Sequence, residues 1–168
     1  MKIESALAGI RRVAFDTSPL IYLIEKHPLY FDRMFLLMQM LDQGHIIGSA
    51  SVLTLTEVLV HPLKTHNSAL AQAYETILRH SAGFHLVNID VEVGRRAAEL
   101  RSHYGLRTPD ALHLAAAVEN DCDAFITNDR AFNRVVELKI PRSTGFGGNA
   151  RFERKKRRAG SLTSSSGR

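Results

Sequence analysis

Residues 12–19 of the chain read R-V-A-F-D-T-S-P, a brief apolar run that leads straight into an acid, two hydroxyl residues and a proline. Short apolar runs favour buried strands, whereas Asp16, Thr17 and Ser18 are residue types that begin helices and turns. This stretch therefore predicts a strand over residues 12–15 that passes directly into a helix, with the carboxylate of Asp16 at the junction.

Strand-like and helix-like segments alternate along the chain that follows. Further strands are predicted at residues 46–47, 84–89 and 123–127, and residues 135–138 could add a fifth at the edge of the sheet. Helical periodicity fills most of the segments between them. Parallel strands need crossover connections, which are usually helices. The alternation therefore predicts an α/β fold, with a four- to five-stranded, mostly parallel sheet covered by helices on both faces.

Several helix boundaries are predicted from capping residues. Thr108–Asp110 supplies a cap residue, a proline at the first helical position and an acid in the first turn. Asp90 is expected to cap the preceding helix. A helix that begins at Ser49 or Ser51 is expected to end before Pro62, because proline disfavours helical backbone at the residue before it.

Charge divides the chain into two parts. With 168 residues, 45% of them hydrophobic and 23% charged, the sequence has the composition of one globular domain. Its formal net charge of +5 is unevenly placed, because residues 142–168 carry +7 and the preceding residues carry −2. We expect one domain over residues 1–141 and a basic, disordered tail beyond it. The run Arg154–Arg158 in this tail could attract phosphate backbones, or could simply be solvated.

The sequence favours a cytoplasmic protein. Cys122 is the single cysteine, so no disulfide can form within the chain. The first twelve residues include Glu4 and lack the long apolar stretch of a secretory signal. No segment approaches the roughly 18 consecutive apolar residues of a membrane helix. We therefore expect no membrane association.

Four acids are candidates for one metal site. Asp16 follows the first predicted strand and Asp129 follows the fourth, so both should lie at the edge where ligands bind in open α/β sheets. Asp110 is expected in the first turn of one helix, and Glu57 about two turns into the helix that follows the second strand, so both can reach the same edge. Four converging carboxylates repel one another unless a cation lies between them, and their hard oxygens favour Mg²⁺ or Mn²⁺ over zinc. Taken singly, each acid could instead be a helix cap, a turn residue or a solvated side chain.

Four motifs carry a family resemblance. They are VAFDTS (Val13–Ser18), LTEVLV (Leu55–Val60), TPDALHLAAA (Thr108–Ala117) and AFITNDRAF (Ala124–Phe132), and together they extend over roughly residues 10–140. In this order they resemble the PIN-domain nucleases, and within that family the VapC-type ribonuclease toxins. The resemblance implies a three-layer α/β/α fold. A longer segment before the first strand and the basic tail depart from the family pattern.

The resemblance also implies roles for individual residues. It assigns Asp16, Glu57, Asp110 and Asp129 to a catalytic, metal-binding quartet for Mg²⁺ or Mn²⁺. Thr127 and Asn128 would form a supporting turn, and Thr17 and Ser18 would line the same pocket. Phosphate-contact candidates are Lys64, Arg107, Arg130 and Arg134.

The activity implied is endoribonucleolytic hydrolysis by a metal-activated water, which leaves 5′-phosphate and 3′-hydroxyl ends. The implied partners are an RNA substrate, a cognate antitoxin and a second copy of the chain in a homodimer. The alternatives are a catalytically idle PIN-like module that binds RNA or protein, and a nuclease directed at DNA.

Other site chemistries have weaker support in the sequence. The histidines show no HExxH spacing and there is no paired CxxC, which argues against a zinc site. His113 is expected to pack inside its helix interface rather than to face substrate. No GxGxxG or GxxxxGK[ST] motif is present, and Ser18 stands where an aspartyl phosphotransferase would usually have a second acid.

Overall fold

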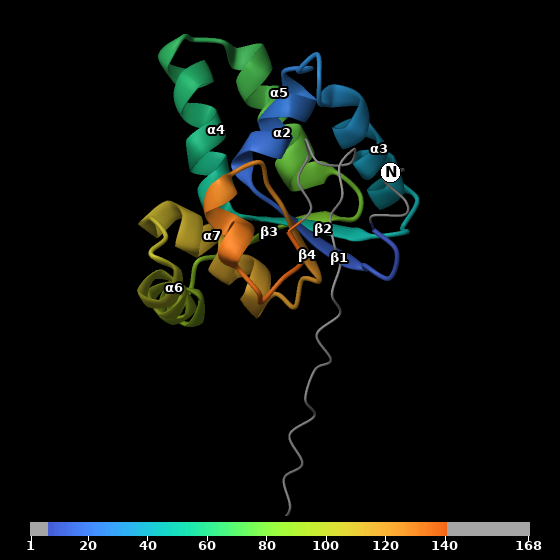
Figure 1. Cartoon of the computed structure of the whole chain (residues 1–168). Coiled ribbons are helices and arrows are strands. Elements are labelled where there is room, and N and C mark those ends of the chain that lie inside the picture. The colour runs from blue at the N-terminus through green and yellow to red at the C-terminus, as the bar shows by residue number, and fades with distance from the viewer. Residues whose placement is uncertain (1–6, 141–168) are drawn as a thin grey trace, which may run out of the picture.

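The computed structural model describes residues 7–140 of the protein (Figure 1), so the predicted domain end at residue 141 and the basic tail lie outside the described residues. None of the described helices has both the length and the apolar character needed to cross a bilayer. The strands are β1 (Arg12–Phe15), β2 (Ile47–Ser51), β3 (Phe84–Val87) and β4 (Ala124–Ile126). The helices are α2 (Thr17–Ile24), α3 (Phe31–Asp42), α4 (Val52–Lys64), α5 (Ser68–His80), α6 (Val91–Tyr104), α7 (Thr108–Glu119) and the short 3₁₀ helix η1 (Arg130–Arg134).

The four strands form one parallel sheet in the order β3-β2-β1-β4. Ala14 in the central strand β1 is in register with Ser49 of β2 and with Phe125 of β4. The fifth strand expected at residues 135–138 does not form in the described part of the chain. Lys139 alone makes a parallel bridge to Ala124, because its neighbours turn away after one pair of backbone hydrogen bonds.

Alternating side chains of the sheet build two cores, which gives the three-layer α/β/α arrangement that the resemblance implies. Val13 and Phe15 pack into the cluster formed with α2, α3, α4 and α5. Ala14 and Phe125 face the opposite way and pack against α6 and α7. Successive residues of a strand point to opposite faces, so β1 and β4 each contribute to both cores. Figure 1 shows the sheet between these two groups of helices.

Capping residues begin most of the helices as predicted. Asp16 caps α2, Ser51 caps α4 and Asp90 caps α6, each through a side-chain oxygen that accepts a backbone N–H. The prediction for α7 was wrong by one residue. Arg107 is its N-cap and makes no side-chain capping bond, while Thr108 already has helical backbone.

Helix α4 does not end before Pro62, contrary to the prediction. It continues through the proline to Lys64 and is closed by Thr65, whose N–H and hydroxyl both bond the carbonyl of His61 at 3.0 Å. Proline removes only one helical hydrogen bond. Because Pro62 lies in the last turn and is buried against the protein, the neighbouring packing and the threonine cap hold that turn in place.

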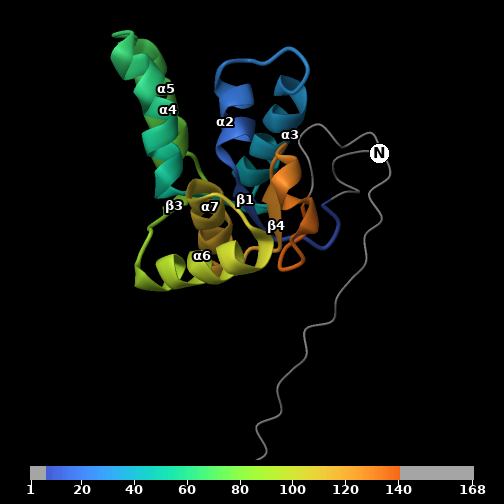
Figure 2. The same cartoon turned by 60° about the vertical axis from the view of Figure 1, so that its left-hand side comes forward.

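Two helical hairpins stand side by side on one side of the sheet (Figure 2). One consists of α2 and α3, and the other of α4 and α5. The buried Tyr74 of α5 donates its hydroxyl to Glu25 Oε1 at the end of α2, at 2.6 Å. Burial and this bond to a carboxylate raise the pKa of Tyr74. The contact joins the two hairpins away from the sheet.

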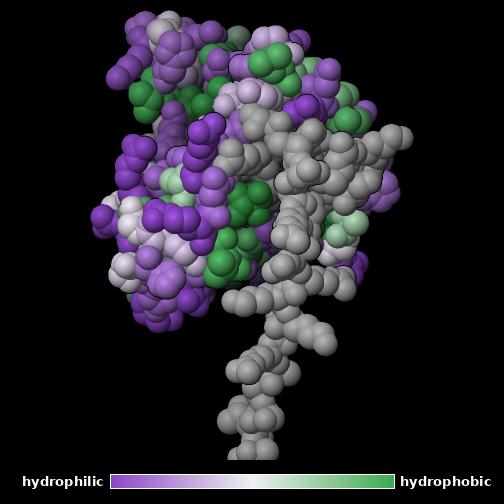
Figure 3. Space-filling view, in the orientation of Figure 1, coloured by the Kyte–Doolittle hydropathy of each residue, from purple (hydrophilic) through white to green (hydrophobic). Residues whose placement is uncertain are grey.

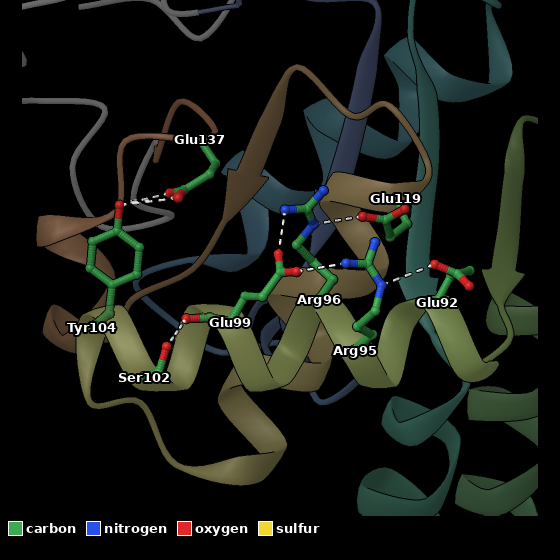
Figure 4. Close-up of polar contacts among 8 residues, drawn as sticks. All are labelled: Glu92, Arg95, Arg96, Glu99, Ser102, Tyr104, Glu119 and Glu137. Atoms are coloured by element: carbon green, nitrogen blue, oxygen red, sulfur yellow. Dashed lines mark hydrogen bonds and ion pairs between the residues drawn. The ribbon is translucent and has the colours of Figure 1, made fainter.

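Charged side chains tie α6 to its neighbours on the outer face (Figure 4). Arg96 bonds Glu99 on its own helix and Glu119 of α7, both at 2.7 Å, and the hydroxyl of Tyr104 donates to Glu137. Hydrophilic side chains also dominate the surface over α6 in Figure 3. Exposed ion pairs of this kind each stabilise by at most about 1 kcal/mol, so they orient α6 more than they stabilise the fold.

Candidate functional site

Asp16 lies at the carboxyl end of the central strand β1 and is held on both carboxylate oxygens. Its Oδ1 accepts the backbone N–H of Thr17 at 2.8 Å, which caps α2. Its Oδ2 accepts the hydroxyl of Thr127 at 2.6 Å. Its own N–H donates to the carbonyl of Ile126 at 2.9 Å, which extends the pairing of β1 with β4. Asp16 therefore has a fixed position between the two strands.

The turn after β4 brings a second acid to the same edge. Thr127 is fully buried, and its Oγ1 accepts the backbone N–H of Asp129 at 3.0 Å while its hydroxyl donates to Asp16. Asp129 caps η1 by accepting the N–H of Ala131 at 2.7 Å. Asn128 lies between them and is half-buried. One threonine side chain thus links two of the predicted metal ligands.

Glu57 reaches this edge from α4 and is bound by two donors. The hydroxyl of Thr17 donates to its Oε2, and Nε2 of His113 on α7 lies 3.1 Å from the same oxygen. The hydroxyl of the buried Thr54 lies 3.4 Å from that of Thr17. The bond from His113 lowers the pKa of Glu57; burial opposes this, and Thr17 adds to it. Glu57 is therefore held as a carboxylate next to the residue that follows Asp16.

Asp110 stands in the first turn of α7, with its side chain 25% exposed. Its pKa is raised, first by burial and then by the negative charges of Asp129 and Asp16, while Arg107 and His113 act in the opposite direction. The side chain of Arg107 is largely exposed, and its Nε lies 3.7 Å from Asp110 Oδ2. Asp110 is thus close enough to Asp16 and Asp129 to be repelled by both.

The arrangement fits a divalent ion in its chemistry but is not a ready-made coordination site. Among residues 7–140, no group of three or more His, Cys, Asp or Glu side chains is placed so that it could already hold a metal ion. The donors are nevertheless hard carboxylate oxygens, the kind that Mg²⁺ and Mn²⁺ prefer. In the same part of the chain Asp16 and Asp129 form no ion pair. Binding an ion would therefore require the carboxylates to move together.

Comparison with protein-family profiles identifies the family of the chain. The profile of the PIN domain matches residues 13–138, from the first residue of the buried β1 run to the segment beyond η1. The chain belongs to the PIN-domain family. The match contains all four of the predicted carboxylates.

Solved structures give the same fold. The PIN domain is similar to VapBC2 from Rickettsia felis, solved with a DNA fragment from its promoter (18% identity, TM-score 0.64, 78% of this chain and 98% of that one). It is also similar to a toxin–antitoxin complex from Klebsiella pneumoniae (27%, 0.59, 75% and 94%). A third is Mycobacterium tuberculosis VapC20, described as a sarcin-ricin loop cleaving toxin (15%, 0.57, 76% and 98%). No curated protein matches the chain.

The predicted phosphate contacts of the PIN domain divide into two groups. Arg107 and Arg130 are exposed and adjoin Asp110 and Asp129, so they lie at the edge of the carboxylate group. Lys64 ends α4, seven residues and therefore about 10 Å beyond Glu57. Arg134 donates to the carbonyl of Tyr104 at 3.0 Å, which gives its guanidinium a structural bond. Of these four residues, Arg107 contacts a predicted ligand within the described part of the chain. Ser18 lies half-buried in the first turn of α2.

Two site contacts went unrecognised in the sequence. His113 is buried, as expected for a residue that packs between helices, but it also bonds Glu57. Thr54 is fully buried beside Thr17. Each lies three residues from a predicted ligand on the same helix, His113 from Asp110 and Thr54 from Glu57, which places it on that ligand's face. That spacing was the available signal.

Asp110→Asn is expected to stabilise the metal-free PIN domain by about 0.5–1 kcal/mol at neutral pH, because it removes a half-buried charge repelled by Asp129 and Asp16. Since the folded pKa is raised above the ordinary value of 3.8, the native aspartate costs stability above its folded pKa. This cost in stability disappears as the pH falls below the pKa that Asp110 has in the unfolded protein. Urea unfolding in EDTA measures the stabilisation by Asp110→Asn at pH 7 and its loss at pH 3.5.

A matched control is Asp32→Asn, which removes an exposed acid from the first turn of α3. It should be neutral or slightly destabilising, because it loses only a favourable helix-dipole interaction. An Asp110→Asn variant that is less stable than the native protein at pH 7 would show that the three aspartates do not repel one another.

Proposed function

We propose that this PIN domain is a Mg²⁺- or Mn²⁺-dependent endoribonuclease and acts as the toxin of a toxin–antitoxin pair. The observation that carries the proposal is the placing of Asp110 near Asp16 and Asp129 at one sheet edge, where burial and the negative charges of Asp129 and Asp16 raise the pKa of Asp110. Glu57 joins them through Thr17. Because Arg107 is the only described cation in an ion pair with any of the three aspartates, a divalent cation is the natural counter-charge.

The four carboxylates would hold the ion, and the fixed side chains around them would set its place. When bound, a Mg²⁺ or Mn²⁺ ion supplies an activated water and neutralises charge on the scissile phosphate. Thr127 holds Asp16 on one side, and Thr17 connects Asp16 with Glu57 on the other. The exposed guanidinium groups of Arg107 and Arg130 lie where they could bind adjacent phosphates of an RNA strand.

The toxin assignment rests on the family and its neighbours. The PIN profile covers most of the chain, and the similar structures include VapBC complexes and a VapC toxin described as cleaving the sarcin-ricin loop. We propose that this chain likewise acts on RNA in the cytoplasm, is restrained by a cognate antitoxin and forms a homodimer. Exposed apolar side chains on α3, Phe35 and Leu36, are consistent with a protein partner.

A second candidate is a catalytically idle PIN-like module that binds RNA or protein. It is favoured by one observation, that the described residues hold no preformed metal-binding group. In that case the carboxylates would serve as helix caps, as Asp16 and Asp129 already do.

Incubating the protein with a 5′-labelled RNA pool separates the two functions. Mn²⁺ is added at about 5 mM, on the order of 10³ times the protein concentration. The nuclease is expected to release fragments with 5′-phosphate and 3′-hydroxyl ends and to leave DNA of the same sequences uncut. An idle module would retain RNA in a filter-binding assay with no fragments formed. Equal cleavage of RNA and DNA would show that the substrate is nucleic acid in general and not RNA alone.

A further inference from the structure

The buried imidazole of His113 makes a single polar contact, and that contact is to Glu57. The side chain is 3% exposed, and its Nε2 lies 3.1 Å from Glu57 Oε2. The other ring nitrogen, Nδ1, has no hydrogen-bond partner among the described residues. A buried ring with one satisfied nitrogen is uncommon, because burial normally pairs polar atoms. Among the described residues, the hydrogen bond of this ring therefore goes to Glu57.

The direction of this hydrogen bond follows from the chemistry of the two groups. A glutamate side chain is a carboxylate at neutral pH, and a carboxylate can only accept hydrogen bonds. The hydrogen must therefore be on Nε2. In the neutral ring Nδ1 then has only a lone pair, whereas the opposite tautomer would bury an N–H without an acceptor.

Both donors to Glu57 meet at the same oxygen. The hydroxyl of Thr17 and Nε2 of His113 bond Oε2, and all side-chain hydrogen bonds of Glu57 within residues 7–140 go to that atom. The hydroxyl of Thr54 contacts the hydroxyl of Thr17 at 3.4 Å and does not bond Glu57. The carboxylate is thus fixed through one oxygen, and Oε1 stays without a protein donor.

We propose that His113 is a positioning residue that holds Glu57 by Oε2, so that Oε1 is the oxygen available to a bound metal ion. The inference rests on the proposed metal-dependent function. Partners that orient a ligand in this way typically contribute 10- to 100-fold to metal affinity. His113 would act from α7 on a ligand of α4 rather than as a ligand of the ion. It joins two helices that sequence separates by 56 residues.

The test compares two amides of different reach. His113→Gln places an amide nitrogen the same number of bonds from the backbone as Nε2, whereas His113→Asn is one bond shorter and should not reach Glu57. Mn²⁺ affinity, measured without RNA from the electron paramagnetic resonance signal of free Mn²⁺, should fall about tenfold in the asparagine variant and by less than about threefold in the glutamine variant. For RNA cleavage, kcat should fall in parallel while KM stays unchanged.

His85→Asn is the matched control. Its Nε2 also bonds a neighbour, Asn120, but at the opposite end of α7, so Mn²⁺ affinity should stay at the native value. Equal affinities for the native protein and the asparagine variant would overturn the positioning role. So would equal loss in the asparagine and glutamine variants, which would show a packing role. A native protein that binds no Mn²⁺ and cuts no RNA would overturn the proposed function and this inference together.

A readout on the native protein does not depend on the variants folding or on any metal. In EDTA, the ¹⁵N chemical shifts of the imidazole should show hydrogen on Nε2 and none on Nδ1. The signals of His113 are assigned by the peak that disappears in His113→Gln. If that variant does not fold, through-bond correlation assigns them. Hydrogen on Nδ1 would overturn the proposed hydrogen bond.

Discussion

Asp16→Asn is expected to lower RNA cleavage by about 10³-fold or more, because it removes a charge that would bind the metal, and such charge stabilisation is worth several kcal/mol at roughly 1.4 kcal/mol per tenfold. Asparagine keeps the volume of aspartate and a side-chain oxygen that can accept the N–H of Thr17, so α2 should remain capped. Initial rates of fragment release and thermal unfolding of the same samples measure the two properties.

The control for this variant is Asp90→Asn, which changes another N-cap aspartate. Asp90 accepts the N–H of Val93 at the start of α6, next to the outer strand β3, and has no bond to the carboxylate group. It should cleave RNA at the native rate. Native cleavage by Asp16→Asn, or equal loss in both variants, would remove Asp16 from the chemistry.

Chelation is expected to abolish cleavage and to lower thermal stability at the same time. Without an ion, Asp110 is repelled by Asp16 and Asp129, and an ion that binds the folded state stabilises it by about 2.7 kcal/mol at 100 times its Kd. Excess EDTA should therefore stop fragment release and lower the unfolding temperature. Added Mg²⁺ or Mn²⁺ should restore both.

Two comparisons make the chelation experiment specific. EDTA saturated with Mg²⁺ beforehand should leave cleavage intact, which separates metal removal from other effects of the chelator. In Asp16→Asn, Mn²⁺ should shift the unfolding temperature much less than in the native protein. Cleavage that persists in excess EDTA would refute a metal-dependent mechanism for this protein.

Local chemistry made much of the fold predictable. The order of strands and helices, the caps at Asp16 and Asp90 and the placing of acids after strands all follow from neighbouring residues in the sequence. The two cores likewise follow from alternation within strands such as β1. These features depend on interactions within a few residues, which a single sequence records directly.

The remaining features depend on contacts between distant segments. The bond between His113 and Glu57 exists only because α4 and α7 pack together, and no local pattern encodes that pairing. The turn at Pro62 survives because the packed surroundings compensate one lost helical bond. The expected fifth strand does not form for the opposite reason. Residues 135–138 have a strand-like composition, but within the described residues only the next residue, Lys139, forms a bridge to the sheet.

The strand order has a consequence for the stage of synthesis at which the proposed nuclease activity could first appear. Asp16 belongs to the beginning of the domain and Thr127 to its end, 111 residues later, yet the two strands that carry them are adjacent in the sheet. Domains emerge from the ribosome in order and fold as units. A partly synthesised chain therefore lacks Asp129 altogether, and the proposed nuclease activity could arise only after nearly the whole domain has been made.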